Sequence, residues 1–254
     1  MTDPKTDSMS DPMIADPPTA HLIQDGAIRL ALFLPQYSKD PATGAVRGLG
    51  PGVVMLEIAR ALAARAGAKL LIVEQPTPRA ALDCVKAGGC EFAFLGIEPS
   101  RAAEIDFTPA VFQFDYSFLV PAGSSLRHFA DVDRAGVRVI VVRNHASTMA
   151  LTRLAEHAEL IGFDLPDDAF AALCDGNAEA FAAPRPILDD YAEKLPGSRV
   201  LAQGYGVNRV GIAVAKQRPG LLSYLTAFVA EAKVSGLIAR LIEEAGLRGF
   251  AVAV

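Results

Sequence analysis

One arginine follows a buried strand at a point where anion-binding chemistry could be assembled. In the stretch FLGIEPSRAAEIDFTP (94–109), an apolar run stops at a glycine, a proline favours a helix start, and Arg101 comes next. A guanidinium has a planar fork of donors that matches a carboxylate, and nearby helix N-terminal amides would reinforce anion binding. We therefore expect Arg101 to bind an anion. The alternative is a surface arginine paired with Glu98, Glu104 or Asp106.

The elements that must position this arginine alternate between strand and helix. Apolar runs predict buried strands at 27–34, 69–75 and 90–96. Helices with proline near their starts and glycine at their ends are expected between them, at 51–67 and 77–89. A β-α-β-α-β unit of this kind implies parallel strands with right-handed crossovers. Loops at the carboxyl ends of such strands form the usual ligand crevice.

The second half of the chain repeats this rhythm, which predicts a second lobe. Strands are expected at 137–142, 159–163, 178–183, 199–204 and 210–220. Helices are expected at 147–158, 166–176, 184–197, 218–231 and 234–245. We predict an α/β fold with a flexible tail at 1–26, one lobe at 27–119 and 213–254, and the other at 120–212.

Composition narrows the class of protein. The chain has 254 residues, of which 51% are hydrophobic and 21% charged, so it is globular. Its net charge of −5 argues against nucleic acid as a partner. The odd number of cysteines argues against a disulfide framework, and we interpret Cys84, Cys90 and Cys174 as buried structural thiols.

The first residues carry no apolar segment of the secretory type. Residues 1–26 are acidic and rich in proline, and no run of apolar residues elsewhere is long enough to span a membrane. As written, the sequence predicts a cytoplasmic protein, or a periplasmic one if the start was misassigned. Neither nucleophile–base motifs nor histidine spacings typical of metal sites occur, so we expect no catalytic residues, no metal and no cofactor.

The order of elements, together with several short motifs, resembles the bacterial extracellular solute-binding proteins of family 3, the amino-acid type of ABC transporters. The residues that carry the resemblance are GIEPSR (96–101) followed by IDFTP (105–109), VKAGGCE (85–91), and the stretch VPAGSSLRHFADVDRAGVRVIVV (120–142). The resemblance implies a type II periplasmic-binding-protein fold with two crossovers and an interlobe cleft. It also implies a monomer that binds a small molecule and works with an ABC permease or a signalling module.

The resemblance also implies roles for individual residues. Arg101 would hold the ligand's carboxylate, and the loop after the first strand would present an aromatic side chain, Phe33 or Tyr37, to the ligand. Pro78 begins a helix at a cleft-facing strand end. A turn whose amides bind the carboxylate is occupied here by Asn144, His145, Ala146 and Ser147. Asparagine tolerates the left-handed conformation, so the turn can form without glycine. His145 could donate to an anion or be an exposed loop histidine.

The departures from the family pattern concern the ligand's ammonium group. Phe94 and Gly96 stand where hydroxyl side chains are usual, and Pro184-Arg185 stands where an acid usually binds the ammonium. A cation there would repel an ammonium group, so we expect a ligand other than an ordinary α-amino acid. Facing arginines at 101 and 185 would suit a carboxylate or dicarboxylate, unless Arg185 is a plain surface residue.

Two other functions fit the same fold. Relatives of this family dehydrate prephenate-like acids with a cleft arginine and an acid, and Glu98 beside Arg101 could be that acid. The apparent lack of a secretory segment would instead suit a cytoplasmic ligand sensor. A binding protein for a small carboxylate remains the main prediction.

Overall fold

The computed structural model describes residues 26–34 and 36–254. The tail predicted at 1–26 therefore lies, apart from Gly26, outside the described residues. The described chain is a mixed α/β structure built on one eleven-stranded sheet and a separate two-stranded hairpin. None of its helices combines the length and the hydrophobicity that crossing a membrane requires.

The first lobe contains three parallel strands in the order β4-β1-β5. Its main elements are β1 (Ala27–Phe33), α1 (Pro51–Arg65), β4 (Lys69–Gln75), α2 (Pro78–Lys86), β5 (Phe92–Gly96), α8 (Pro219–Val234) and α9 (Leu237–Glu244). Short elements complete it: β2 (Tyr37–Lys39), β3 (Val46–Gly48), α3 (Pro99–Ala102), β6 (Asp106–Phe107) and β13 (Phe250–Val252). Alternate residues of β1 face opposite ways, so Leu30 packs with α1 and α8 while Ala31 packs with α2.

The second lobe repeats the arrangement around β10-β8-β9, which are also parallel. Its elements are α4 (Phe129–Val132), β8 (Arg138–Val142), α5 (Ala146–Thr152), β9 (Glu159–Phe163), α6 (Pro166–Cys174), β10 (Ala180–Pro184), α7 (Arg185–Lys194) and β11 (Arg199–Val200). Helices α6 and α7 cover one face of these strands, with Ile140 and Phe181 in the shared core. Leu151 of α5 packs with the side chains of the other face.

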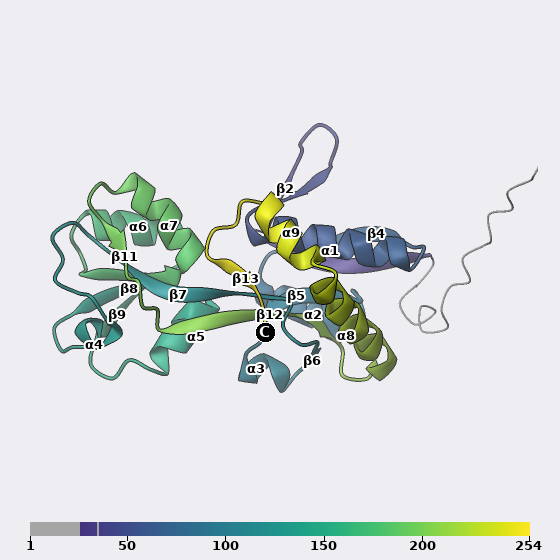
Figure 1. Ribbon diagram of the computed structural model, residues 1–254. Helices are drawn as coiled ribbons and strands as arrows, with labels where there is room; N and C mark the ends of the chain where they lie inside the picture. Colours follow the sequence, from purple (N-terminus) through teal and green to yellow (C-terminus); the bar gives the residue numbers. More distant parts are fainter. Residues whose placement is uncertain (1–25, 35) are drawn as a thin grey trace, which may run out of the picture.

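Two long strands connect the lobes. β7 (Phe112–Val120) and β12 (Gly206–Val214) pair with each other in antiparallel register, and β12 also pairs with β5 while β7 pairs with β10. Figure 1 shows them running between the lobe that holds α6 and α7 and the lobe that holds α1, α8 and α9. The predicted lobe boundaries, at 119/120 and 212/213, fall inside these continuous strands. The division of the chain into lobes at these residues remains a prediction.

Helix α5 is shorter than the sequence predicted, ending at Thr152 instead of 158. The amides of Glu156, His157 and Ala158 all donate to the carboxylate of Asp133, at 2.8–3.1 Å. Because these three amides donate to a side chain, they do not form the backbone hydrogen bonds that would continue the helix. The prediction missed this because Asp133 is distant from these residues in sequence.

The interpretation of the cysteines as buried thiols is wrong. Cys84 in α2 and Cys90 before β5 form a disulfide, and Cys174 is exposed. The Gly88-Gly89 turn reverses the chain between helix and strand and brings the two Cα atoms to 5.6 Å, within the usual range for a bridge. An odd number of cysteines excludes complete pairing, but it leaves a single local bridge possible.

Removing this bridge should destabilise the protein. Because a loop with a sequence separation of six is short, the Cys84→Ser/Cys90→Ser double variant should lose about 2 kcal/mol of unfolding free energy. Urea denaturation without reductant measures the loss, and Cys174→Ser is the matched control that should leave stability unchanged. Thiol titration of the unfolded wild-type protein should find one thiol without reductant; a result of three would contradict the bridge.

Candidate ligand-binding site

A cavity of about 220 Å³ lies where the two lobes face each other. Most residues that the sequence predicted for a ligand site line it: Phe33, Pro78, Phe94, Gly96, Arg101, Asn144, His145, Ala146, Ser147 and Pro184. The sequence did not predict the rest of the described lining: Leu34, Gln36, Pro51, Met55, Phe114, Tyr116, Ile187, Asn208 and Val210. The lining is thus mostly apolar, with a few polar side chains among aromatic and aliphatic ones.

Strand direction explains why these residues converge. Phe33 and Gly96 end the parallel strands β1 and β5, and Pro184 ends β10 in the other lobe. Since parallel strands share one carboxyl edge, each lobe presents one such edge to the cavity. Helix α1 also begins at the cavity with Pro51, and it has no acidic residue in its first turn. The positive end of its dipole therefore favours a negative ligand.

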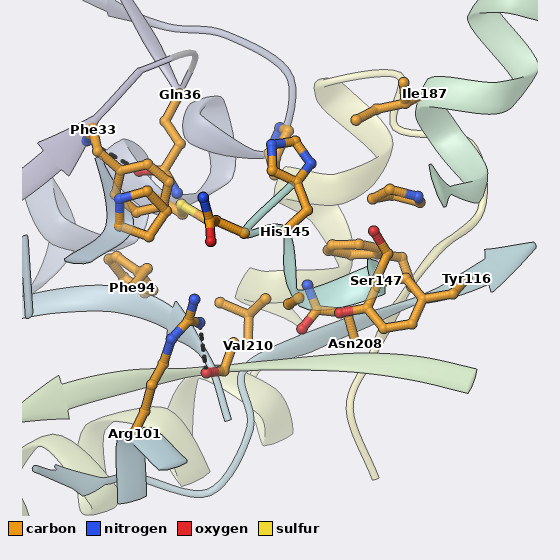
Figure 2. Close-up of a pocket in the computed structure, with 18 of the residues that line it drawn as sticks. Phe33, Gln36, Phe94, Arg101, Tyr116, His145, Ser147, Ile187, Asn208 and Val210 are labelled. Atoms are coloured by element: carbon orange, nitrogen blue, oxygen red, sulfur yellow. Dashed lines mark hydrogen bonds between the residues drawn. The ribbon is translucent and has the colours of Figure 1, made fainter. Parts of the chain in front are cut away.

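Arg101 supplies the cationic group of the cavity. Its Nη1 donates to the carbonyl oxygen of Gly96 at 3.0 Å, and among the described residues it makes no ion pair. Burial lowers its pKa, which the negative charge of Glu98 partly opposes. Figure 2 shows the side chain rising from the chain below, with its guanidinium beside Phe94 and Val210 in this view. The alternative of a surface arginine paired with Glu98, Glu104 or Asp106 is wrong, because Arg101 is half-buried and pairs with none of these three acids.

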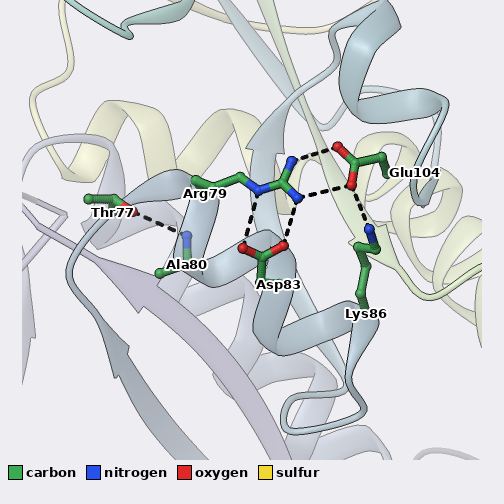
Figure 3. Close-up of polar contacts among 6 residues, drawn as sticks. All are labelled: Thr77, Arg79, Ala80, Asp83, Lys86 and Glu104. Carbon is green, nitrogen blue, oxygen red and sulfur yellow. Dashed lines mark hydrogen bonds and ion pairs between the residues drawn. The ribbon is translucent and has the colours of Figure 1, made fainter.

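A surface network holds the segment that carries Arg101. Glu104, just after α3, pairs with Nη1 of Arg79 at 2.6 Å and with Nζ of Lys86 at 2.5 Å. Arg79 also pairs with Asp83 on the same helix at 2.9 Å. Figure 3 shows that these contacts connect the residue after α3 to one face of α2. The two cations lower the pKa of the Glu104 carboxyl to about 2, so the network persists at neutral pH.

Gly96 leaves the space in which Asn208 lies. A Cβ atom at position 96 would lie 2.7 Å from Oδ1 of Asn208 and 3.3 Å from Nη1 of Arg101. Asn208 comes from β12, whose Val210 is the register partner of Gly96. The family usually has a hydroxyl side chain at the position of Gly96. In this chain the side-chain amide of Asn208, from the neighbouring strand β12, occupies the adjacent space.

The turn after β8 keeps its shape without glycine. Asn144 has a φ of 62°, so the prediction that asparagine would adopt the left-handed conformation is confirmed. The next residue, His145, precedes α5 and is half-buried in the cavity wall, so the alternative of an exposed loop histidine is wrong. Burial lowers the pKa of His145, which keeps the imidazole neutral at pH 7.

Three predicted residues lie outside the cavity lining. The hydroxyl of Tyr37 donates to Oε2 of Glu74 at 3.1 Å. Arg185 donates through Nη2 to the carbonyl oxygen of Ala202 at 2.9 Å and to that of Leu201. Arg185 therefore binds backbone carbonyls after β11 and does not face Arg101, which removes the basis for a dicarboxylate held by two arginines.

Glu98, the third of these residues, connects the two lobes. It precedes α3 in the first lobe and pairs at 3.0 Å with Nη2 of Arg153, which follows α5 in the second. Glu98 is almost fully buried, whereas 54% of the Arg153 side chain is exposed. This ion pair spans the two lobes, and Glu98 is not among the described residues that line the cavity.

Four of the nine lining residues that the sequence did not predict come from the connecting strands. Phe114 and Tyr116 lie on β7, while Asn208 and Val210 lie on β12. Asn208 is followed by Arg209 and precedes the apolar run that starts at Val210, so the local pattern contains no signal that could have indicated it. Tyr116 carries no such signal, because a buried tyrosine is ordinary in a strand.

Comparison with known proteins gives a consistent family match. Residues 43–246 match the model of the bacterial extracellular solute-binding proteins, family 3. A glutamine-binding protein of Geobacillus stearothermophilus is 25% identical, covering 74% of this chain and 71% of the relative. The ABC transporter glutamine-binding protein of Bacillus subtilis (strain 168) is 23% identical, covering 78% and 72%. An ancestral amino acid-binding protein, a precursor of cyclohexadienyl dehydratase, has a similar structure with a TM-score of 0.71 at 22% identity, covering 89% and 97%.

Removing the cross-lobe ion pair should favour lobe opening. Exposed ion pairs contribute about 0.2–1 kcal/mol, and loss of Arg153 would also leave the buried Glu98 carboxylate without its partner. Arg153→Ala should therefore raise the open population by about fivefold or more. Hydrogen–deuterium exchange of the unliganded protein should become faster at α3 and α5. Arg143→Ala is the matched control, since it removes an exposed pair with Asp164 inside the second lobe. Equal exchange in the two variants would show that the pair between Glu98 and Arg153 does not hold the lobes together.

His145 should make stability depend on pH. Its pKa is lowered in the folded state, so below about pH 6.5 the unfolded chain takes up a proton that the folded chain does not. The contribution of neutral His145 to the free energy of unfolding is therefore complete above this pH. It is lost as the pH falls toward the folded-state pKa. We expect the melting temperature of His145→Gln to fall less than that of wild type between about pH 7 and about pH 5.5. Parallel pH profiles of the two proteins would exclude this contribution.

Proposed function

The chain belongs to family 3 of the bacterial extracellular solute-binding proteins, and on that premise we propose that it binds a small apolar carboxylate that lacks an ammonium group. This membership confirms the resemblance and the two-lobed type II fold expected from the sequence. The observation that supports this ligand is the charge of the cavity. Arg101 is its cation, and no aspartate or glutamate is among the described residues that line it.

An ammonium group would find poor partners in this cavity. Transferring a charged amine from water to an apolar site is costly unless an anion or several acceptors receive it. The positions that face the cavity supply a neutral histidine, amides and hydroxyls, together with a cation. Amino-acid relatives share this fold, but the ligands in their names do not transfer to a site of this charge.

The shape of the cavity supports a small, mainly apolar ligand. Its volume of about 220 Å³ is below the ~300–1,000 Å³ of typical drug-sized pockets. Phe33, Phe94 and Phe114 contribute aromatic surface, and Met55 and Ile187 contribute aliphatic surface. A branched or aromatic body with a carboxylate directed at Arg101 satisfies both the apolar walls and the cation.

We propose binding and not catalysis as the role of the site. The dehydratase alternative requires an acid in the cavity, yet Glu98 is held by Arg153 and is not part of the lining. As a binding protein the chain would act as a monomer and deliver its ligand to an ABC permease, as the name of the Bacillus relative suggests. We place the protein in an oxidising, exported compartment, because the family is extracellular and Cys84 is bridged to Cys90.

Matched small acids test this proposal. Isothermal titration with 4-methylpentanoate, 2-oxo-4-methylpentanoate and leucine compares one carbon skeleton with and without an ammonium group. We expect at least one of the amine-free acids to bind, and leucine to bind at least about tenfold more weakly than it.

The same titrations with Arg101→Ala test the anchor. Losing a charge-assisted hydrogen bond of about 1.5–3 kcal/mol should weaken binding of the acid at least about tenfold. Arg60→Ala, an exposed arginine of α1 that pairs with Glu57, is the control and should bind like wild type. Leucine binding as tightly as the amine-free acids, or an Arg101→Ala variant of unchanged affinity, would contradict the proposed ligand class.

A further inference from the structure

We propose that the hydroxyl of Tyr116 is a ligand-binding donor, and that the ligand therefore carries an oxygen acceptor close to its carboxylate, as a 2-oxo acid does. This inference rests on the proposed function and deepens it. It assigns the ligand's second polar group to a residue that neither the sequence motifs nor the family pattern indicated.

The first argument is that this hydroxyl is buried without a partner. Tyr116 is 2% exposed, and its hydroxyl has no hydrogen-bond partner among the described residues. Buried polar groups are nearly always paired, and leaving one unpaired costs about 1–3 kcal/mol. A hydroxyl group in the wall of a ligand cavity can be paired by the ligand instead.

The neighbouring hydroxyl groups differ from that of Tyr116 in this respect. Tyr205, whose ring stacks on Tyr116 at 5.7 Å, donates to the carbonyl oxygen of Ser147 at 3.3 Å. Ser117, the next residue of β7, donates to the carbonyl oxygen of Leu201 at 2.8 Å. The local structure thus pairs both of these hydroxyls internally and leaves the one on the cavity wall unpaired.

The ring of Tyr116 is held in a fixed position. Its strand pairs with β12 at Gly206 and with β10 at Pro184. Phe114 packs edge-on against the ring at 6.2 Å, and Tyr205 stacks on it. Since the ring has little freedom to turn away, its hydroxyl is pre-organised to meet a ligand atom.

The surroundings of the hydroxyl indicate what it would bind. In Figure 2 the Tyr116 side chain points toward Asn208, whose amide also lines the cavity. Burial raises the pKa of the Tyr116 hydroxyl, the negative charge of Glu98 raises it further and the charge of Arg101 opposes this, so the hydroxyl remains a protonated donor. Donors from Arg101, Tyr116 and Asn208 therefore converge on one region, where a carboxylate with an adjacent carbonyl would use them.

The test compares two acids that differ only at C2. Isothermal titration with 2-oxo-4-methylpentanoate and 4-methylpentanoate is carried out on the wild type and on Tyr116→Phe. We expect the wild type to bind the oxo acid about tenfold more tightly than the unsubstituted acid, and Tyr116→Phe to remove this preference. Affinity for the unsubstituted acid should stay within about twofold of wild type, because the carboxylate still reaches Arg101.

A thermal measurement separates this role from a structural one. The unliganded Tyr116→Phe variant should melt no lower than the wild type, since the hydroxyl has no partner to lose. Tyr205→Phe is the matched control and should melt lower, because it loses the bond to Ser147. A lower melting temperature for Tyr116→Phe, with both acids weakened equally, would show a structural role and overturn the proposal.

The remaining outcomes distinguish this inference from the function on which it rests. An unchanged oxo-acid preference in Tyr116→Phe, or equal binding of both acids by the wild type, overturns the role of Tyr116 but leaves the carboxylate site intact. If neither acid binds the wild type, or if binding does not depend on Arg101, the proposed function itself fails, and the assignment of Tyr116 fails with it.

Discussion

The antiparallel pairing of β12 with β5 and β7 is the constraint on which the rest of the structure depends. It joins two sets of parallel strands into one sheet and turns the carboxyl edge of each set toward the other. The cavity, its mixed lining and the contact between the lobes all follow from this arrangement. The same strands also supply side chains of their own, so the connection between the lobes is part of the site.

The charge of the site depends on where the neighbouring acids are held. Arg101 has carboxylates close by in sequence, which would neutralise it if they were free. Glu104 is occupied by Arg79 and Lys86, and Glu98 is occupied by a residue of the other lobe. The guanidinium is therefore desolvated and makes no ion pair with any described residue, although the charge of Glu98 still acts on it. An anionic ligand would give this guanidinium a direct partner.

Local sequence signals predicted the residues that lie at strand ends. Gly96 and Pro184 end apolar runs, and Arg101 follows the first of them. The direction of parallel strands is enough to bring such residues to the carboxyl edge of their own lobe, and the two edges face the same cavity. Tyr116 and Asn208 could not be found in this way, because their positions depend on the register between strands far apart in the sequence. The bridge between Cys84 and Cys90 and the orientation of Arg185 similarly depend on how a turn or a distant carbonyl is placed in space.

Because Arg153 is the exposed member of the cross-lobe ion pair, the strength of this pair depends on the ionic strength of the solution. Arg153 faces solvent while its partner Glu98 does not, so mobile ions reach the pair from one side. At about 0.1 M ionic strength the Debye length is near 10 Å, and at about 1 M it shrinks to near 3 Å, comparable with the pair itself. The lobes should therefore close less readily in a saline medium than in a dilute one.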